Sequence, residues 1–203
     1  DGLLIDSQSV PGLDAEGLAA LIPPIIGPAD ELGESVARGT LKTAAKAFVD
    51  ALNPSTAGTH IGQSSFSDSG SLDLHLNDTT ATIKAAIDAL LSGGFTNLSE
   101  GISLATGELA SHEHERDVVP DFMVVITDGN PNRPGSTEAE GKAAATIAAN
   151  AAKAAGIEIY VVGVGNELDA TFLKTIASGD SHYFDATDFS NLQAQLAKLA
   201  TCK

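Results

Sequence analysis

The sequence predicts an α/β fold: a doubly wound, mostly parallel six-stranded sheet with one antiparallel edge strand and helices on both faces. Three observations support this prediction. Short apolar runs alternate with amphipathic segments of helical length over most of the chain. Residues 122–127 are apolar without alternation, which is typical of a strand covered on both faces, and residues 157–164 predict a second buried strand. Residues 60–66 and 71–76 are joined through the turn-forming sequence SDSGS, which predicts a hairpin at one edge.

The beginning of the chain predicts one strand followed by an irregular segment. Residues 3–5 are apolar and precede a polar stretch, so we expect them to form the first strand. Residues 10–39 contain prolines that would break a long helix, yet they are too apolar for a disordered linker. We therefore expect a partly helical insertion that packs on a single domain covering residues 1–203.

The middle of the chain predicts three helices. Residues 41–52 place apolar side chains on one helical stripe, and residues 80–91 do so ahead of two glycines that end the helix. A further helix begins near Asn97 and runs to residue 109. The residues expected to be buried in the second of these helices are Ile83, Ile87, Leu90 and Leu91.

The second half of the chain continues the alternation after the strand at residues 122–127. An alanine-rich helix begins at Thr137, where Glu140 three residues later completes a capping box, and it ends at Gly156. The remaining expected elements are, in order, the strand 157–164, the helix 169–178, the strand 182–186 and a final helix that carries Phe189, Leu192, Leu196 and Leu199.

Composition limits the partners of the protein. The formal charge of −16, from 11 basic and 27 acidic residues, leaves no basic stripe for nucleic acid. No apolar run approaches the roughly 18 residues of a membrane span, so we expect no membrane insertion. The single cysteine, Cys202, is either an unpaired thiol or pairs outside this segment in a longer secreted parent. The start of the chain has no signal-peptide pattern, which leaves a cytosolic protein or a mature fragment of a larger one.

Oxygen-bearing side chains follow three segments that should meet at one edge of the sheet. They are Asp6, Ser7 and Ser9 after the first strand, Thr96 in a loop before a helix, and Asp128 after a buried strand. Ligands of open α/β sheets bind outside the carboxyl ends of the strands, where these segments converge. A set of oxygen donors without sulfur or imidazole suits Mg²⁺ or Mn²⁺, with Ca²⁺ as a further candidate.

The order of these segments resembles the von Willebrand factor A domain, also called the integrin I-like domain. The resemblance covers about residues 1–9 and 40–203, and its most specific parts are GGFTN, VVITDGNPN and IYVVGVGNELD. In that family a metal-ion-dependent adhesion site takes an Asp-x-Ser-x-Ser loop, a Thr and an Asp from three loops. By position, the resemblance implies that Asp6, Thr96 and Asp128 are metal ligands. We expect Gly129 to permit close approach of the backbone and not to bind the ion.

The first loop departs from the family pattern. Counting Asp-x-Ser-x-Ser from Asp6 places Gln8 and Val10 where the serines should stand, and Ser7 and Ser9 are displaced by one residue. Two interpretations remain open. Either a shortened loop brings Ser7 or Ser9 to the metal, or this chain has lost the site.

The resemblance implies a non-enzymatic adhesion or protein-binding module, extracellular or at the cell surface, cut from a larger secreted protein. Such a domain would recognise a protein or extracellular-matrix ligand when an acidic residue of the ligand takes an open position on the metal. The alternative is a metal-independent structural or assembly module that binds through the insertion at residues 10–39. Dependence of binding on metal distinguishes the two.

Enzymatic alternatives find little support in the sequence. GVGNEL has leucine where a dinucleotide motif needs its third glycine, and GQSSF does not complete a nucleophile elbow. The acidic and histidine-rich run 111–117 lacks the i, i+4 histidine pair of a zinc protease, so we expect a solvated segment. Of two glycosylation sequons, at Asn77 and Asn97, we expect Asn77 to be the usable one.

Overall fold

The computed structural model describes residues 18–22, 31–91, 94–111, 121–165, 168–186, 194 and 196–197. In this part of the chain, six strands form one sheet in the order β3-β2-β1-β4-β5-β6. Neighbouring strands are parallel except β2 and β3, which form an antiparallel hairpin at one edge. The strands are β1 (Leu18–Ile22), β2 (Ile61–Phe66), β3 (Gly70–Asn77), β4 (Phe122–Thr127), β5 (Glu158–Val164) and β6 (Tyr183–Ala186).

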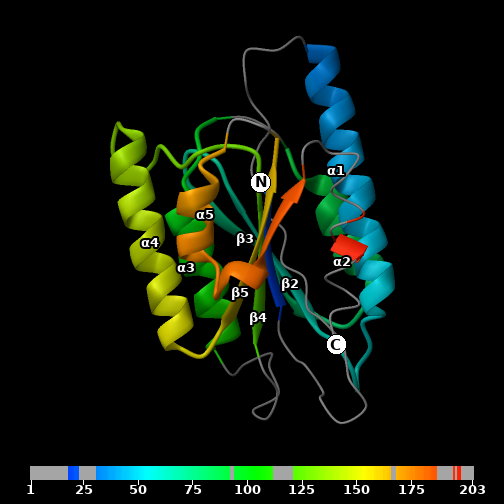
Figure 1. Cartoon of the computed structure of the whole chain (residues 1–203). Helices are drawn as coiled ribbons and strands as arrows, with labels where there is room; N and C mark the ends of the chain where they lie inside the picture. The colour runs from blue at the N-terminus through cyan, green and yellow to red at the C-terminus, as the bar shows by residue number, and fades with distance from the viewer. Residues whose placement is uncertain are drawn as a thin grey trace.

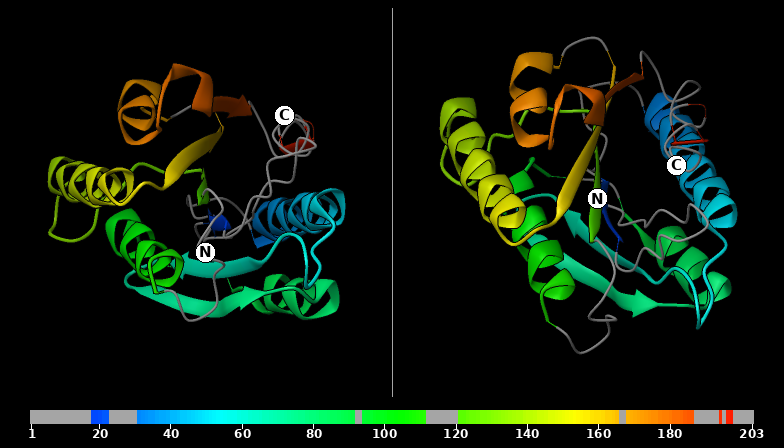
Figure 2. Two further views of the ribbon diagram at one scale, coloured as in Figure 1. Left: turned by 90° about the horizontal axis from the view of Figure 1, so that it is seen from below. Right: turned by 60° about the horizontal axis from the view of Figure 1, so that its bottom comes forward.

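Helices cover both faces of the sheet, so the predicted α/β class is confirmed. Helices α1 and α2 lie on one face, and α3, α4 and α5 lie on the other (Figures 1 and 2). Helix α3 packs against α4 and against the strands β1, β2 and β3. The bounds are α1 (Glu31–Leu52), α2 (Thr80–Ala89), α3 (Leu98–Leu109), α4 (Glu138–Ala154) and α5 (Ala170–Ile176), with a short 3₁₀ helix at Asp180–His182 before β6. None of the described helices combines the length and hydropathy needed to cross a bilayer.

The centre of the sheet differs from the sequence prediction. The strand between β2 and β4 is β1, at residues 18–22, and it lies within the segment 10–39 that was expected to be an insertion. Helix α1 also begins inside that segment, at Glu31, well before the predicted start at residue 41. A short run such as LAALI suits a buried strand or a buried helix equally well, so the sequence pattern alone did not identify a strand. Residues 3–5, the predicted first strand, lie outside the described residues.

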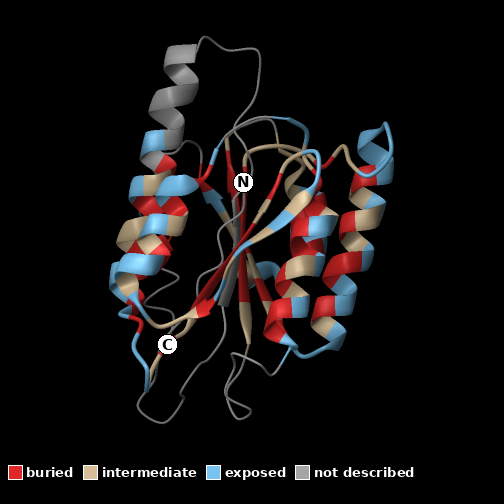
Figure 3. Cartoon of the chain, turned by 180° about the vertical axis from the view of Figure 1, so that it is seen from behind, coloured by how far each residue is buried: buried red, intermediate tan, exposed pale blue. Residues whose placement is uncertain are grey.

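The predicted core stripes are buried against the sheet, as the red faces of the helices in Figure 3 show. The middle of β4 is covered on both faces by helices, which explains why its sequence is apolar without alternation. In α4 the buried side chains are alanines, whose small size lets α3 and α4 approach closely. The buried residues of the predicted stripes in α1 and α3 are Leu41, Ala44, Ala45, Phe48, Val49, Leu52, Leu98, Ile102, Ala105 and Leu109.

The ends of the helices confirm one prediction and correct another. Thr137 and Glu140 form the predicted capping box at the start of α4. The helix α2 ends at Ala89, and Leu90 adopts an extended conformation. Because the chain leaves the helix there, Leu91 is 76% exposed, and the prediction that it is buried is wrong. Of the final predicted helix, residues 194, 196 and 197 are described as helical, and Leu196 is buried.

Candidate functional site

The loop that follows β4 lies beside the loop that precedes α3. A Cβ atom at Gly129 would lie 3.3 Å from the Thr96 Oγ1, so the backbone after Asp128 passes close to that hydroxyl. The Thr96 N–H donates to the Asn132 Oδ1 at 2.9 Å, and the Asn132 N–H donates to the Thr96 carbonyl at 3.1 Å. The structure therefore brings two of the three predicted segments together, with the backbone at Gly129 passing close to the Thr96 hydroxyl.

A hydrogen bond between the two neighbours of Asp128 stabilises the turn at this residue. The buried Thr127 hydroxyl donates to the Gly129 carbonyl at 2.9 Å, which closes the chain around Asp128 directly after the end of β4. Because β1, β4 and β5 are parallel, this turn lies at the edge of the sheet where their carboxyl ends meet. The position agrees with the general rule for ligand sites in open α/β sheets.

Asp6, Ser7 and Ser9, the third predicted segment, lie outside the described residues. In the sequence, the observed strand β1 is followed by Pro23 and Pro24, and neither offers a side-chain oxygen. The role of the first loop as a source of ligands stays a prediction.

The Asp128 carboxyl is in an unusual electrostatic environment. Burial raises its pKa to about 7, and its own backbone N–H lowers the pKa by a smaller amount. In the described part of the chain, no other residue donates a hydrogen bond to this carboxyl or forms an ion pair with it. A desolvated carboxylate without a cationic partner is unfavourable. A bound cation would supply an opposite charge that the described residues do not provide.

The donors fit a hard divalent cation but do not complete a site by themselves. Carboxylate and hydroxyl oxygens are the ligand types that Mg²⁺, Mn²⁺ and Ca²⁺ prefer. The Thr96 hydroxyl, like the Asp128 carboxyl, makes no hydrogen bond to another described residue. Among the residues that the structure describes, no group of three His, Cys, Asp or Glu side chains could hold a metal. Water, or oxygen donors outside the described ranges, would have to complete the coordination.

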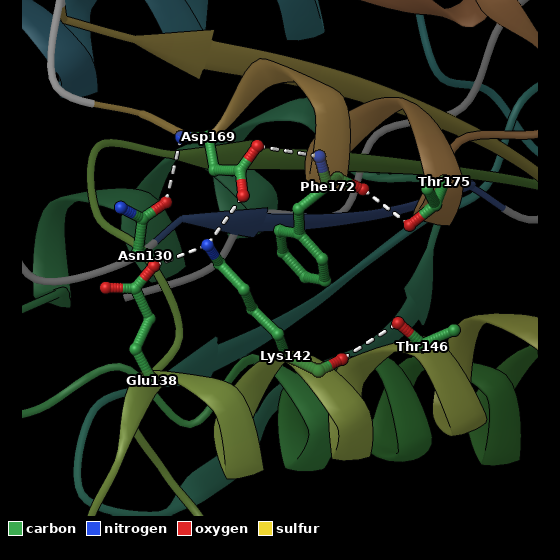
Figure 4. Close-up of polar contacts among 7 residues, drawn as sticks. All are labelled: Asn130, Glu138, Lys142, Thr146, Asp169, Phe172 and Thr175. Atoms are coloured by element: carbon green, nitrogen blue, oxygen red, sulfur yellow. Dashed lines mark hydrogen bonds and ion pairs between the residues drawn. The ribbon is translucent and has the colours of Figure 1, made fainter.

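A polar network, drawn in Figure 4, ties the Asp128 loop to two helices. The Asp169 N–H donates to the Asn130 Oδ1 at 3.0 Å. The Asp169 carboxylate accepts the Phe172 N–H at 3.0 Å, which caps α5, and pairs with the Lys142 Nζ at 2.7 Å. Lys142 also pairs with Glu138 within α4. The sequence predicted a helix starting at Asp169, but its pairing with Asn130 and Lys142 joins distant segments and had no local signal.

Replacing Asp169 by asparagine tests the ionic part of this network. The hydrogen bond from Lys142, followed by that from the Phe172 N–H, holds the pKa of Asp169 below its usual value. The pKa of this carboxyl is lower in the folded than in the unfolded protein, so its ionised form stabilises the fold at pH values above the unfolded pKa of about 3.9. This stabilisation is lost as the pH falls through the folded pKa. Asparagine keeps a capping oxygen but no charge. We expect a lower melting temperature for Asp169→Asn at pH 7, and a difference from the parent protein that shrinks as the pH falls through the folded pKa of Asp169, measured by circular dichroism. An equal difference at pH 3 and pH 7 would contradict this account.

The two sequons differ in accessibility. Asn97 is 7% exposed, and its Nδ2 donates to the Asp68 carbonyl and the Glu100 carboxylate. That nitrogen is therefore engaged in the fold. Asn77, at the end of β3, is partly exposed, and its side-chain amide oxygen accepts the Thr79 N–H at 2.9 Å. The geometry favours Asn77 as the usable position.

The fold is an α/β module with polar loops gathered at the carboxyl ends of its parallel strands, and comparison with known families identifies its kind. The model of the von Willebrand factor type A domain matches residues 33–198, and the chain belongs to this family. Thr96 and Asp128 lie inside the matched range, whereas Asp6, Ser7 and Ser9 precede it. None of the curated proteins compared with the chain matches it.

Solved structures share the fold at low sequence identity. A structure of proximal thread matrix protein 1 from the mussel byssus, described as having a zinc-occupied MIDAS motif, is 23% identical with a TM-score of 0.74, over 93% of this chain and 46% of that one. The chain thus spans about half the length of that protein. The vWF domain of the pili tip protein Mfa5 from Porphyromonas gingivalis is 16% identical with a TM-score of 0.78, covering 93% and 94%. The pilus adhesin SpaC from Lactobacillus rhamnosus GG is 14% identical with a TM-score of 0.74, covering 97% and 31%.

Proposed function

We propose that this chain is an extracellular or cell-surface binding module that recognises a protein or matrix ligand through a divalent cation at the Asp128 edge. The observation that carries the proposal is the desolvated Asp128 carboxyl, unpaired in the described part of the chain and beside the Thr96 loop. Family membership and the adhesion and matrix proteins among its structural neighbours support a binding module over an enzyme.

The residues that would hold the cation are Asp128 and Thr96, together with Asp6 and either Ser7 or Ser9. Mg²⁺ or Mn²⁺ is the expected ion, with Ca²⁺ as a further candidate. When bound, such an ion offers a coordination position that a carboxylate of the ligand can take in place of water. Asp128 would contribute charge, Thr96 a neutral oxygen, and Gly129 the space for both.

The net charge of −16 affects how an acidic ligand would reach this edge. Long-range repulsion slows the encounter of two negative molecules, and lower ionic strength makes it slower. At physiological ionic strength, screening acts over about 8 Å, so charges close to the site dominate once the ligand is near. Binding of an acidic ligand should therefore depend on the local arrangement of charge more than on the net charge.

Calorimetric titration of Mg²⁺ and Mn²⁺ into the chelator-treated protein tests the proposal. We expect saturable binding by the parent protein and none by Asp128→Ala, because the variant lacks the carboxylate at the edge. Thr96→Val keeps the shape of the side chain without the hydroxyl and should weaken binding about tenfold or more.

The matched control is Asp180→Asn, which removes one negative charge from the 3₁₀ helix before the start of β6. This variant should bind the ions as the parent does. The proposal would be overturned if the titration of the parent protein showed no heat or no saturation, or if Asp128→Ala bound the ions equally well. The metal-independent module that binds through residues 10–39 would then be favoured.

A further inference from the structure

An arginine and an exposed phenylalanine form a stacked pair beside Thr96. The Arg133 guanidinium carbon lies 3.4 Å from the centroid of the Phe95 ring. Phe95 is 46% exposed, one of the few large apolar side chains on the described surface, and it directly precedes Thr96 in the chain. Stacking covers one face of the guanidinium with an aromatic ring and restricts its orientation.

Hydrogen bonds hold both partners of the stacked pair in place. The Phe95 N–H donates to the Asp68 Oδ1 at 2.7 Å, which engages that carboxylate with the backbone. The Arg133 N–H donates to the Thr96 carbonyl at 3.3 Å, and its Nη1 donates to the Asn132 carbonyl at 3.0 Å. The guanidinium is therefore set at a defined place on the edge that carries Asp128.

Arg133 differs from the paired lysines of this acidic chain. Lys46, Lys84 and Lys142 each form an ion pair with an aspartate, in a protein with 27 acidic and 11 basic residues. Within the described residues, Arg133 forms no ion pair, and its side chain donates a single hydrogen bond, from Nη1 to the Asn132 carbonyl. An arginine carries five N–H donors in a fork that matches a carboxylate. Most of this donor capacity faces no acceptor in the part of the chain that the structure describes.

We propose that Arg133, stacked on Phe95, is a carboxylate-binding site for an acidic peptide segment of the ligand. The site is separate from the cation site, because the guanidinium supplies its own positive charge. The inference rests on the proposed function, which makes the ligand an acidic protein segment. The contact between Arg133 and a ligand carboxylate itself needs no metal. Two neighbouring acidic residues of one segment would occupy the two sites. Arg133 thus selects ligands in which a second carboxylate lies near the first.

Fluorescence anisotropy with a labelled hexaglutamate peptide, and hexaglutamine as the uncharged control, tests this inference in Mg²⁺ and in EDTA. The parent protein should bind hexaglutamate more tightly than hexaglutamine in both. Arg133→Gln should weaken hexaglutamate binding about fivefold in both conditions. Arg133→Lys, which keeps the charge but loses the planar fork, should weaken it about threefold. Lys174→Gln on α5 makes the same charge change away from this edge and should change binding less than twofold.

The outcomes separate this inference from the proposed function. Equal effects of Arg133→Gln and Lys174→Gln would overturn the carboxylate site, because net charge alone would then explain the loss. Binding that responds to Arg133→Gln but is the same in Mg²⁺ and EDTA would overturn the cation site and keep the arginine site. Binding lost in EDTA and in Asp128→Ala, yet unchanged in Arg133→Gln, would do the reverse. Circular dichroism of each variant establishes that the fold is retained, and Arg133→Lys provides the test should Arg133→Gln not fold.

Discussion

Replacing Gly141 by alanine is expected to lower the free energy of unfolding by about 3 kcal/mol, through overpacking at the start of α4. A Cβ atom at this position would lie 2.4 Å from the Pro131 carbonyl oxygen and 2.8 Å from the Asn132 nitrogen. Both contacts are with backbone, so no side chain can rotate away to relieve them. Alanine is the better helix former by about 1 kcal/mol, which offsets part of the cost only. The loop or the helix must therefore shift.

Urea unfolding measures this loss of stability. The matched control in the same experiment is Gly107→Ala in α3. Gly107 is an exposed helical glycine with nothing within 4 Å of a Cβ position, so alanine there should stabilise the protein by about 0.5 to 1 kcal/mol. The two variants make the same chemical change and should move stability in opposite directions. Changes in unfolding free energy of the same sign and size would show that α4 is not closely packed against the loop at Pro131 in solution. Because Asn132 contacts Thr96, Gly141→Ala should also disturb the candidate site.

The elements that sequence reasoning predicted well are those whose pattern is local. The stripe from Leu41 to Leu52 repeats with the helical period, and the structure buries it. The run at residues 122–127 is apolar throughout because helices cover both faces of β4. The capping box of Thr137 and Glu140 needs residues that are three apart. In each case the information lies within one element.

The features that were missed depend on contacts between distant segments. The run LAALI of β1 carries no period that separates a strand from a helix, and its place in the sheet follows from pairing with β2 and β4. Leu91 belongs to the apolar stripe of the α2 sequence, but the helix ends before it. The stacking of Arg133 on Phe95 joins two loops that are adjacent only in the folded chain. The sequence could identify Thr96 and Asp128 as neighbours because the rule for open α/β sheets places their loops at one edge, and the family resemblance gives the same relation.

Replacing Glu108 by alanine is the second substitution expected to have a large effect on stability. Glu108 lies on the inner side of α3 and is 4% exposed, where the helical pattern predicted apolar neighbours and gave no sign of a buried carboxylate. Its Oε1 accepts the Leu76 N–H at 2.8 Å, and its Oε2 contacts the His75 Nδ1 at 2.8 Å. The side chain therefore links α3 to the edge strand β3 at a buried position.

Glu108→Ala should lower the free energy of unfolding by about 3 kcal/mol, because it leaves the buried Leu76 N–H without its acceptor and opens a cavity beneath β3. Glu108→Gln keeps an oxygen for that N–H and should cost about 1 kcal/mol. His75→Ala removes the partner whose side chain is 62% exposed, and should cost less than about 1 kcal/mol. Urea unfolding of the three variants should give this order of stability losses if the carboxylate acts chiefly as the acceptor for the Leu76 N–H. A loss in His75→Ala as large as that in Glu108→Ala would instead assign the stabilisation to the ion pair.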